Sequence, residues 1–321
     1  MPGTPDEVLA ELSQEWRSPL QARLAAGVRK ALGASLEELR EYAAPLGDAG
    51  LFGPGSIAWS VHADLPAMLI GGLSALMYQT LHPLAMAGVA AHSRFREDPY
   101  GRLQRTARFI AGTTFGATPF AEQLIGEVKA VHDRVSGTAP DGRAYSANDP
   151  ALLTFVHTTE VWSFLRSYQR YAPRPLLSGE KDRYLDEVAR TAELLGAREV
   201  PRSVAAVRRY LRDVEAELVR TPEAAATVHF LLAPVGDTPL EVLGQQLLTA
   251  AAVELLPANV ARRLGLSSRR LGAPGVRAAA GALARGLRWS VGPSAVAAIA
   301  AARVEAGMRS ERGSALSTME C

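Results

Sequence analysis

Cysteine is almost absent from this chain of 321 residues, because the only one is Cys321. A single cysteine excludes a disulfide within the chain, and it excludes the zinc sites that are built from several thiolates. Any ligand or catalyst in the protein must therefore come from other side chains.

Several motifs of well-known enzymes are also missing. The chain has no H-E-x-x-H sequence, and neither His132 nor His157 follows a glutamate by three residues. These absences exclude zinc proteases of the H-E-x-x-H type and di-iron carboxylate bundles. There is no G-x-S-x-G for a hydrolase nucleophile, and the stretch GPGSIA lacks the third glycine of a dinucleotide fingerprint.

Hydrophobic runs of membrane-spanning length are scarce. The N-terminus is acidic and has no apolar run, so we expect no signal peptide. The segment from Leu65 to Ala91 has no Asp, Glu, Lys or Arg, but Gln79, His82 and Pro83 interrupt it. We interpret it as one or two buried helices broken at Pro83, and we expect a cytoplasmic protein without a transmembrane segment.

Charge is balanced over the whole chain, at a formal +2, but the C-terminal part is basic. After Leu255, ten arginines face the three glutamates Glu305, Glu311 and Glu320. A basic helix pair could meet nucleic acid or an anionic membrane, yet the region has no interleaved aromatic residues and no DNA-binding motif. We therefore predict a solvated Arg-rich surface and no nucleic-acid partner.

Helical periodicity dominates the rest, and strand alternation is nowhere convincing. The sequence predicts an all-α fold, a single large helical domain of about ten helices with a buried cofactor pocket. One short hairpin is allowed in the loop before Asp149. We expect an N-terminal helical segment at 1–50, a helical core at 51–258 and packed basic helices at 259–321. The predicted helices are Pro5–Leu32, Ser35–Ala44, Leu65–Ala91, Pro99–Ala111, Thr118 to a C′ stop at Gly137, Asp149–Tyr171, Ser178–Leu195, Ser203–Arg220, Pro239–Ala258 and Val276–Ala306.

Two histidines lie on apolar helix faces. His132 shares a face with Ile125, Val128 and Val135, and His157 shares one with Leu153 and Phe164. A histidine in such a place is either a core residue that bonds a backbone carbonyl or a ligand. Glu160, at i+3 from His157, could orient the His157 ring or could be solvated.

The stretch DPYGRLQRTARF, from Asp98 to Phe109, predicts a helix capped by Asp98 and begun by Pro99. Arg102, Arg105 and Thr106 then lie on one face, and no carboxylate follows before Glu122. We therefore expect the arginines to find their anions elsewhere. A haem group would fit both features, since its iron accepts an imidazole and its propionates accept guanidinium groups and hydroxyls.

The chain resembles a known family in a series of ordered motifs: AWSVHAD, QTLHPLAMAGVAAHS, FREDPYGRLQRT, VHDRVSG and YSANDPALLTFVHTT. This is the haem-b oxygenase family of latex clearing protein (rubber oxygenase) and mpaB-type oxygenases, including its actinobacterial branch. The resemblance covers roughly residues 59–171 and is weaker up to about residue 234.

The resemblance implies a set of site residues. Arg102, Gln104, Arg105 and Thr106 match the R-x-x-K-T motif beside the haem, so Arg102 and Thr106 would hold haem b, and His132 in VHDRV would ligate the iron. His157 would be a further cofactor-binding residue. Arg105 replaces a lysine that can occupy the distal iron position, and an arginine cannot donate a lone pair there. Either the distal position is open, or a neutral residue such as His82 or His92 fills it. Of these we expect an open position or His82, and we expect Arg105 to act as a fixed charge in catalysis.

The family's upstream glutamate base has no counterpart, because no carboxylate occurs between Asp64 and Glu97. Rubber is therefore a poor expectation for the substrate. We expect instead a haem-b-dependent oxygenase that acts with O2 on an apolar, unsaturated or isoprenoid-like small molecule. The alternative is a non-enzymatic helical haem carrier or sensor, or a cofactor-free interaction protein.

Overall fold

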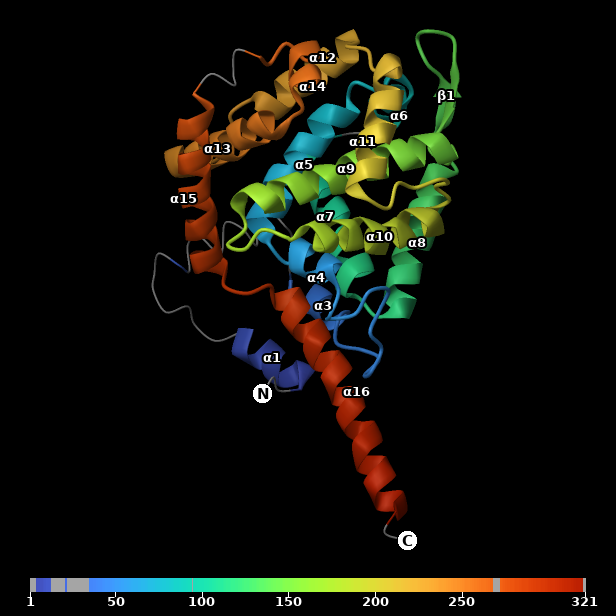
Figure 1. Ribbon diagram of the computed structural model, residues 1–321, viewed down its shortest axis with the longest axis vertical. Helices are drawn as coiled ribbons and strands as arrows, with labels where there is room; N and C mark the ends of the chain where they lie inside the picture. Colours follow the sequence, from blue (N-terminus) through green and yellow to red (C-terminus); the bar gives the residue numbers. More distant parts are fainter. Residues whose placement is uncertain (1–3, 13–20, 22–34, 94, 268–271, 320–321) are drawn as a thin grey trace. The chain divides into compact units, whose positions relative to one another are not determined.

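The computed structural model describes residues 4–12, 21, 35–93, 95–267 and 272–319 (Figure 1). The predicted all-α class is confirmed, because this part of the chain forms fifteen α-helices and a single two-stranded hairpin. Helices outnumber the predicted ten because two predicted segments are each divided, and because three helices, Ile57–His62, Pro222–Leu232 and Ala258–Arg263, were not predicted. Val276–Ala306, for example, is split where Gly292 and Pro293 end one helix and precede the next. Most of the predicted helix Pro5–Leu32 lies outside the described residues.

Contacts group the chain into two compact units, and the predicted division at 50 and 258 stays a prediction. The first unit comprises Met1–Ala63, Asp98–Glu127 and Arg288–Cys321. It contains α1 (Pro5–Leu12), α3 (Leu36–Arg40), α4 (Ile57–His62), α7 (Pro99–Phe115), most of α8 (Thr118–His132) and α16 (Ala295–Met319).

The second unit comprises Asp64–Glu97 and Val128–Leu287. Its elements are α5 (Leu65–Gln79), α6 (Pro83–His92), β1 (Ser136–Thr138), β2 (Ala144–Ser146), α9 (Pro150–Tyr171), α10 (Ser178–Leu195), α11 (Val204–Asp213), the 3₁₀ helix η1 (Val214–Glu217), α12 (Pro222–Leu232), α13 (Pro239–Leu255), α14 (Ala258–Arg263) and most of α15 (Ala273–Val291).

The uncharged segment forms two helices, as predicted. α5 ends at Gln79 and α6 begins at Pro83, whose ring has no N–H to continue a helix. The ring of His82 caps α6 by accepting a hydrogen bond from the Ala85 backbone N–H. Within the described part of the chain, no helix has the length and apolar character needed to cross a membrane.

α9 is the central helix of the second unit and packs most extensively against α5. The two backbones approach closely at Gly71, where a Cβ atom would lie only 3.0 Å from the Cα of Phe164 and from the backbone oxygen of Ser163. Phe164 and Leu165 are buried at this level of α9, and Phe155 is buried nearer to its start. A glycine at position 71 therefore allows α5 and α9 to pack this closely.

The predicted end of α8 is wrong. The helix stops at His132, five residues before the expected C′ glycine, and the chain then enters the β1–β2 hairpin that the loop allowed. Gly137 pairs with Tyr145 across the hairpin, and a Cβ atom at Gly137 would lie 2.7 Å from the Tyr145 hydroxyl. The glycine therefore makes room for a tyrosine ring and does not end a helix.

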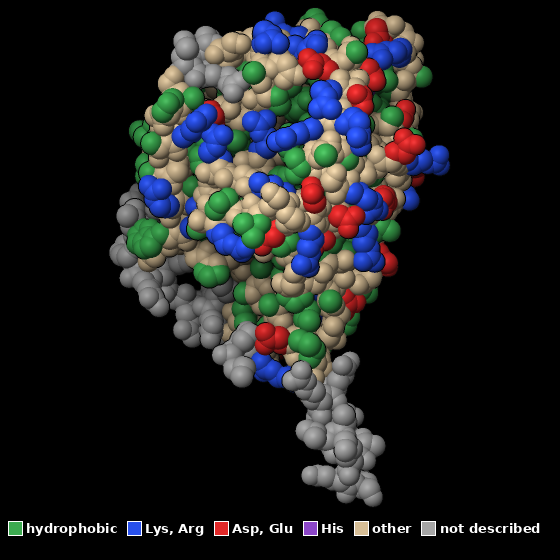
Figure 2. Space-filling model, viewed as in Figure 1, with side chains coloured by type: hydrophobic (Ala, Val, Ile, Leu, Met, Phe, Trp, Pro, Cys, Tyr) green, Lys and Arg blue, Asp and Glu red, His purple; other side chains and the backbone are tan. Residues whose placement is uncertain are grey.

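The prediction of a solvated arginine surface fails at Arg303 in α16. Its side chain is completely buried, and its guanidinium donates to the backbone oxygens of Tyr42 at 2.7 Å, Asp48 at 2.9 Å and Phe115 at 3.0 Å. Arg303 thereby ties α16 to the loop after α3 and to the end of α7. Charges of both signs are interspersed on the face drawn in Figure 2. Elsewhere in the chain Arg202 forms ion pairs with Asp186 and Glu193.

Asp48 organises the same region of the first unit. Its side chain accepts hydrogen bonds from the backbone N–H of Gly50 at 2.7 Å and from the backbone N–H and hydroxyl of Thr118 at 2.9 and 3.0 Å. Burial by itself raises the pKa of Asp48, but these bonds outweigh it and hold the pKa below its ordinary value. α8 is therefore capped by a carboxylate that lies seventy residues away in sequence.

Candidate functional site

The Arg/Thr helix is α7, and its predicted cap is confirmed, since the Asp98 side chain accepts a hydrogen bond from the Gly101 N–H at 2.8 Å. The expectation that the arginines lack a local anion is wrong for Arg105. Its guanidinium lies 3.4 Å from the second Asp98 oxygen, and the Arg105 side chain is 71% exposed. The charge of Arg105 is thus solvated and offset by Asp98.

Arg102 and Thr106 lie one turn apart on α7. The Thr106 hydroxyl donates to the Arg102 backbone oxygen at 3.0 Å, which is the usual back-bond of a helical threonine. The side chain of Arg102 is half-buried, and burial, assisted by the charge of Arg105, lowers its pKa. Burial therefore disfavours the charged form of the Arg102 side chain.

His132 and His157 each have one buried ring nitrogen that makes no hydrogen bond within the described part of the chain. The Nδ1 atom of His132, at the end of α8, and the Nε2 atom of His157, in α9, are buried and have no hydrogen-bond partner among the described residues. Buried polar atoms are nearly always paired, so the core-histidine interpretation, in which a carbonyl accepts from the ring, does not describe these two atoms. Both remain candidates for binding a metal-centred cofactor.

Both imidazoles are neutral at pH 7. Burial lowers the pKa of His132, although the charge of Asp133 opposes the shift. Burial lowers the pKa of His157 to about 4. A neutral imidazole has a lone pair to give to a metal ion, so the state of these rings suits ligation of iron.

Glu160 lies one turn after His157 on α9. Its side chain is half-buried, and burial raises its pKa to about 7. Burial also raises the pKa of Tyr184 in α10, and the charge of Glu160 contributes to that shift. The sequence offered Glu160 as a group that orients His157 or is solvated, but burial makes it a carboxyl that can take up or release a proton near neutral pH.

The raised pKa of Glu160 predicts a pH-dependent stability. The folded state keeps this proton up to about pH 7, whereas the unfolded chain loses it near the ordinary value of 4.5, so the Glu160 contribution to stability falls as pH rises between the two. We expect Glu160→Gln to leave stability unchanged at pH 4 and to raise it by roughly 1 to 3 kcal/mol at pH 8.

Urea unfolding of the wild type and the Glu160→Gln variant across this pH range checks the prediction. Glu122→Gln, at an exposed position of α8, is the control and should have no effect at either pH. Equal stability of the Glu160 variant and the wild type at pH 8 would contradict a buried, destabilising carboxylate.

His82 and His92 have partners for their rings. The Nδ1 atom of His82 accepts from the Ala85 N–H, so in the neutral ring Nε2 carries the proton, and this atom lies 3.7 Å from a Glu217 carboxylate oxygen. The Nε2 atom of His92 lies 3.1 Å from the Tyr145 hydroxyl. His82 could ligate a metal only by giving up its role as the cap of α6.

The predicted residues fall into two local sets. Arg102, Arg105 and Thr106 share α7 in the first unit, while His82, His132 and His157 belong to the second. No group of three His, Cys, Asp or Glu side chains within the described ranges is arranged to bind a metal ion. A haem iron takes only one or two axial ligands from the protein, so single histidines are the relevant candidates.

Comparison with known proteins identifies the family. The family model described as ER-bound oxygenase mpaB/B′/rubber oxygenase, catalytic domain, matches residues 59–289. Searches of curated proteins and of solved structures found no match. The match extends well beyond the motifs recognised in the sequence and includes all the candidate residues on α7, α8 and α9. The chain therefore belongs to the mpaB and rubber oxygenase catalytic-domain family.

Proposed function

We propose that this oxygenase depends on haem b and uses O2 to oxidise an apolar, unsaturated or isoprenoid-like small molecule. Family membership supports an oxygenase, and hence an enzyme. The observation that carries the cofactor proposal is the buried Nδ1 atom of His132, which has no hydrogen-bond partner in the described residues and belongs to a ring that burial keeps neutral. The VHDRV match points to the same histidine.

The other residues would support the cofactor. His132 would ligate the iron, and His157 would add a second neutral imidazole. Arg102 and Thr106 would bind the propionates, a proposal that rests on their match to the family motif and on the partial burial of the Arg102 side chain. Haem supplies the redox chemistry that activates O2. We assign no role to Arg105 beyond its ion pair with Asp98.

Glu160 adds a proton-transfer group to the proposal. A carboxyl with a pKa near 7 is close to even occupancy at neutral pH, so it can deliver or accept a proton without a large free-energy cost. Glu160 would thus serve as the base in place of the upstream glutamate of the family, which this sequence lacks.

We expect His132→Ala to lose haem or to shift the Soret band, because the iron would lose its nitrogen ligand. The measurement is the absorption spectrum of the purified protein and its haem content after competition with apo-myoglobin. His229→Ala, at an exposed position of α12, is the matched control and should keep both.

Oxygen uptake on addition of candidate lipids completes the test. Uptake by haem-loaded wild type supports the oxygenase, whereas a Soret band without any uptake would favour a haem carrier. Full haem with an unchanged spectrum in the His132 variant would refute the assignment of the ligand, and protein that never binds haem would refute the cofactor.

A further inference from the structure

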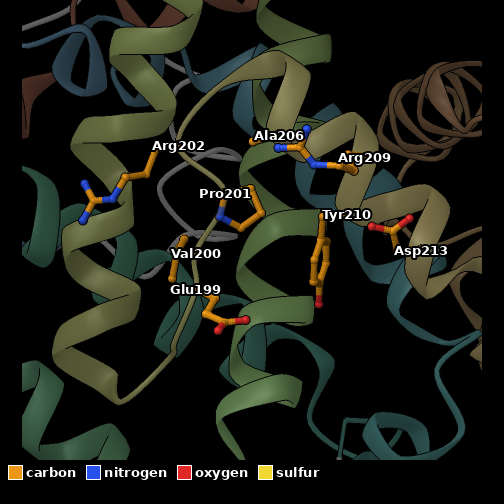
Figure 3. A pocket seen from close by; sticks show the side chains of 8 residues that line it. All are labelled: Glu199, Val200, Pro201, Arg202, Ala206, Arg209, Tyr210 and Asp213. Atoms are coloured by element: carbon orange, nitrogen blue, oxygen red, sulfur yellow. The ribbon is translucent and has the colours of Figure 1, made fainter.

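Two neighbouring cavities in the second unit share Tyr210 and Asp213 of α11. The larger, of about 370 Å³, lies between α11 and the loop at residues 199–202 (Figure 3). The smaller, of about 230 Å³, reaches from the same two residues to Phe155 in α9, Glu217 in η1 and His82. None of the residues proposed to hold haem, His132, His157, Arg102 and Thr106, lines either cavity, and His82, which the sequence offered as a distal ligand, is held as the cap of α6.

Negative charge prevails in the two cavities. Glu199, Asp213 and Glu217 contribute carboxylates, while Arg209 and Arg202 contribute guanidinium groups. The charge of Arg202 is already neutralised by Asp186 at 2.8 Å and Glu193 at 2.6 Å, and Figure 3 shows its side chain turned away from Tyr210. The smaller cavity has two carboxylates and no lysine or arginine in its lining.

The buried imidazole of His82 is part of the lining of the smaller cavity. His82 is only 4% exposed, and its bond from Ala85 places the ring proton on Nε2, 3.7 Å from the Glu217 carboxylate. Burial lowers the pKa of His82, so the ring adds no positive charge at pH 7 to offset the acids. The positive charge of Arg143 lowers the pKa of His82 further, and the negative charge of Asp149 opposes this shift.

Aromatic surface accompanies this negative charge. The Tyr210 ring is half-buried and lines both cavities, whereas the Phe155 ring packs on the His82 ring with centroids 4.7 Å apart and is itself almost completely buried. Aromatic faces attract organic cations, and carboxylates at a cavity rim select for the same charge. An anionic ligand would meet repulsion from Asp213 and Glu217.

We propose that these joined cavities bind an organic cation, a small amine or quaternary ammonium compound with an apolar body, between Tyr210, Asp213 and Glu217. This site goes beyond the proposed oxygenase function and does not depend on haem.

Isothermal titration calorimetry of the full chain with benzyltrimethylammonium chloride tests the proposal, with benzyl alcohol and sodium benzoate as the neutral and anionic comparators. We expect the cation to bind more tightly than either comparator. In the double variant Asp213→Asn/Glu217→Gln, binding of the cation should weaken about tenfold, because two carboxylates lose their charge. Both positions are exposed, so the variant is expected to fold, which circular dichroism verifies.

Glu122→Gln, at an exposed position of α8, removes one charge elsewhere and should leave the affinity for the cation unchanged. Absence of binding at millimolar concentrations, equal affinity for benzyl alcohol, or unchanged affinity in the folded double variant would each overturn the proposal. Haem content plays no part in this readout, so its outcome is separate from that of the His132 experiment.

Discussion

Replacing Arg303 with methionine is expected to lower the free energy of unfolding by about 3 to 5 kcal/mol. The substitution keeps most of the apolar stem but removes the donors that satisfy the backbone oxygens of Tyr42, Asp48 and Phe115. Each buried carbonyl left without a donor costs part of its hydration free energy. Arg303→Lys should recover only a small part of the loss, since an ammonium cannot reach three diverging oxygens as a planar guanidinium does.

Chemical unfolding monitored by circular dichroism measures this effect. Arg309→Met is the matched control on the same helix, because Arg309 is 53% exposed and pairs with Glu305 one turn away. Its loss should cost less than about 0.5 kcal/mol. Arg303→Met with the stability of the Arg309 control would contradict the idea that this buried arginine holds the first unit together.

The double variant Arg170→Met/Arg277→Met is expected to cost about 3 to 5 kcal/mol at pH 8. Glu254 in α13 is only 4% exposed, and its oxygens lie 2.9 Å from the Arg170 guanidinium and 2.8 Å from Nε of Arg277. Removing both arginines takes two guanidinium partners away from a buried carboxylate, which is far more costly than removing a solvated ion pair. The loss should shrink at pH 5, where the buried carboxyl can take up a proton.

Adding Glu254→Gln to the double variant provides the decisive comparison. The neutral amide removes the buried charge, so the triple variant should regain more than half of the lost stability at pH 8 and show little dependence on pH. Unfolding in urea at the two pH values gives both quantities. If the triple variant were no more stable than the double one, packing of the arginine stems and not charge would explain the cost.

Local sequence patterns predicted elements that depend on neighbouring residues. Asp98 and Pro99 begin α7, Asp149 and Pro150 begin α9, and Pro83 breaks the uncharged segment, each because a cap or a missing N–H acts within one helical turn. Helix boundaries that depend on residues far away along the chain were not predicted. α8 is capped by Asp48, and it ends at His132 because the hairpin begins, facts that no local pattern contains.

The candidate site divides in the same way. The positions of His132 and His157 on apolar faces, and the grouping of Arg102, Arg105 and Thr106, could be read from the period of the helix. The proton affinity of Glu160 and the ion pair of Arg105 with Asp98 could not, since desolvation and side-chain reach depend on what surrounds each group.

The sequence by itself determined the all-α class, the starts of the central helices and the family, because these follow from periodicity, capping residues and ordered motifs within short spans. Only the tertiary structure decided which charges are buried. Arg303 and Glu254 lie in segments that look like ordinary charged helix in sequence, yet they are desolvated by residues up to 261 positions away. Burial is a property of the three-dimensional surroundings, and for ionisable groups it fixes both the energetic role and the chemistry.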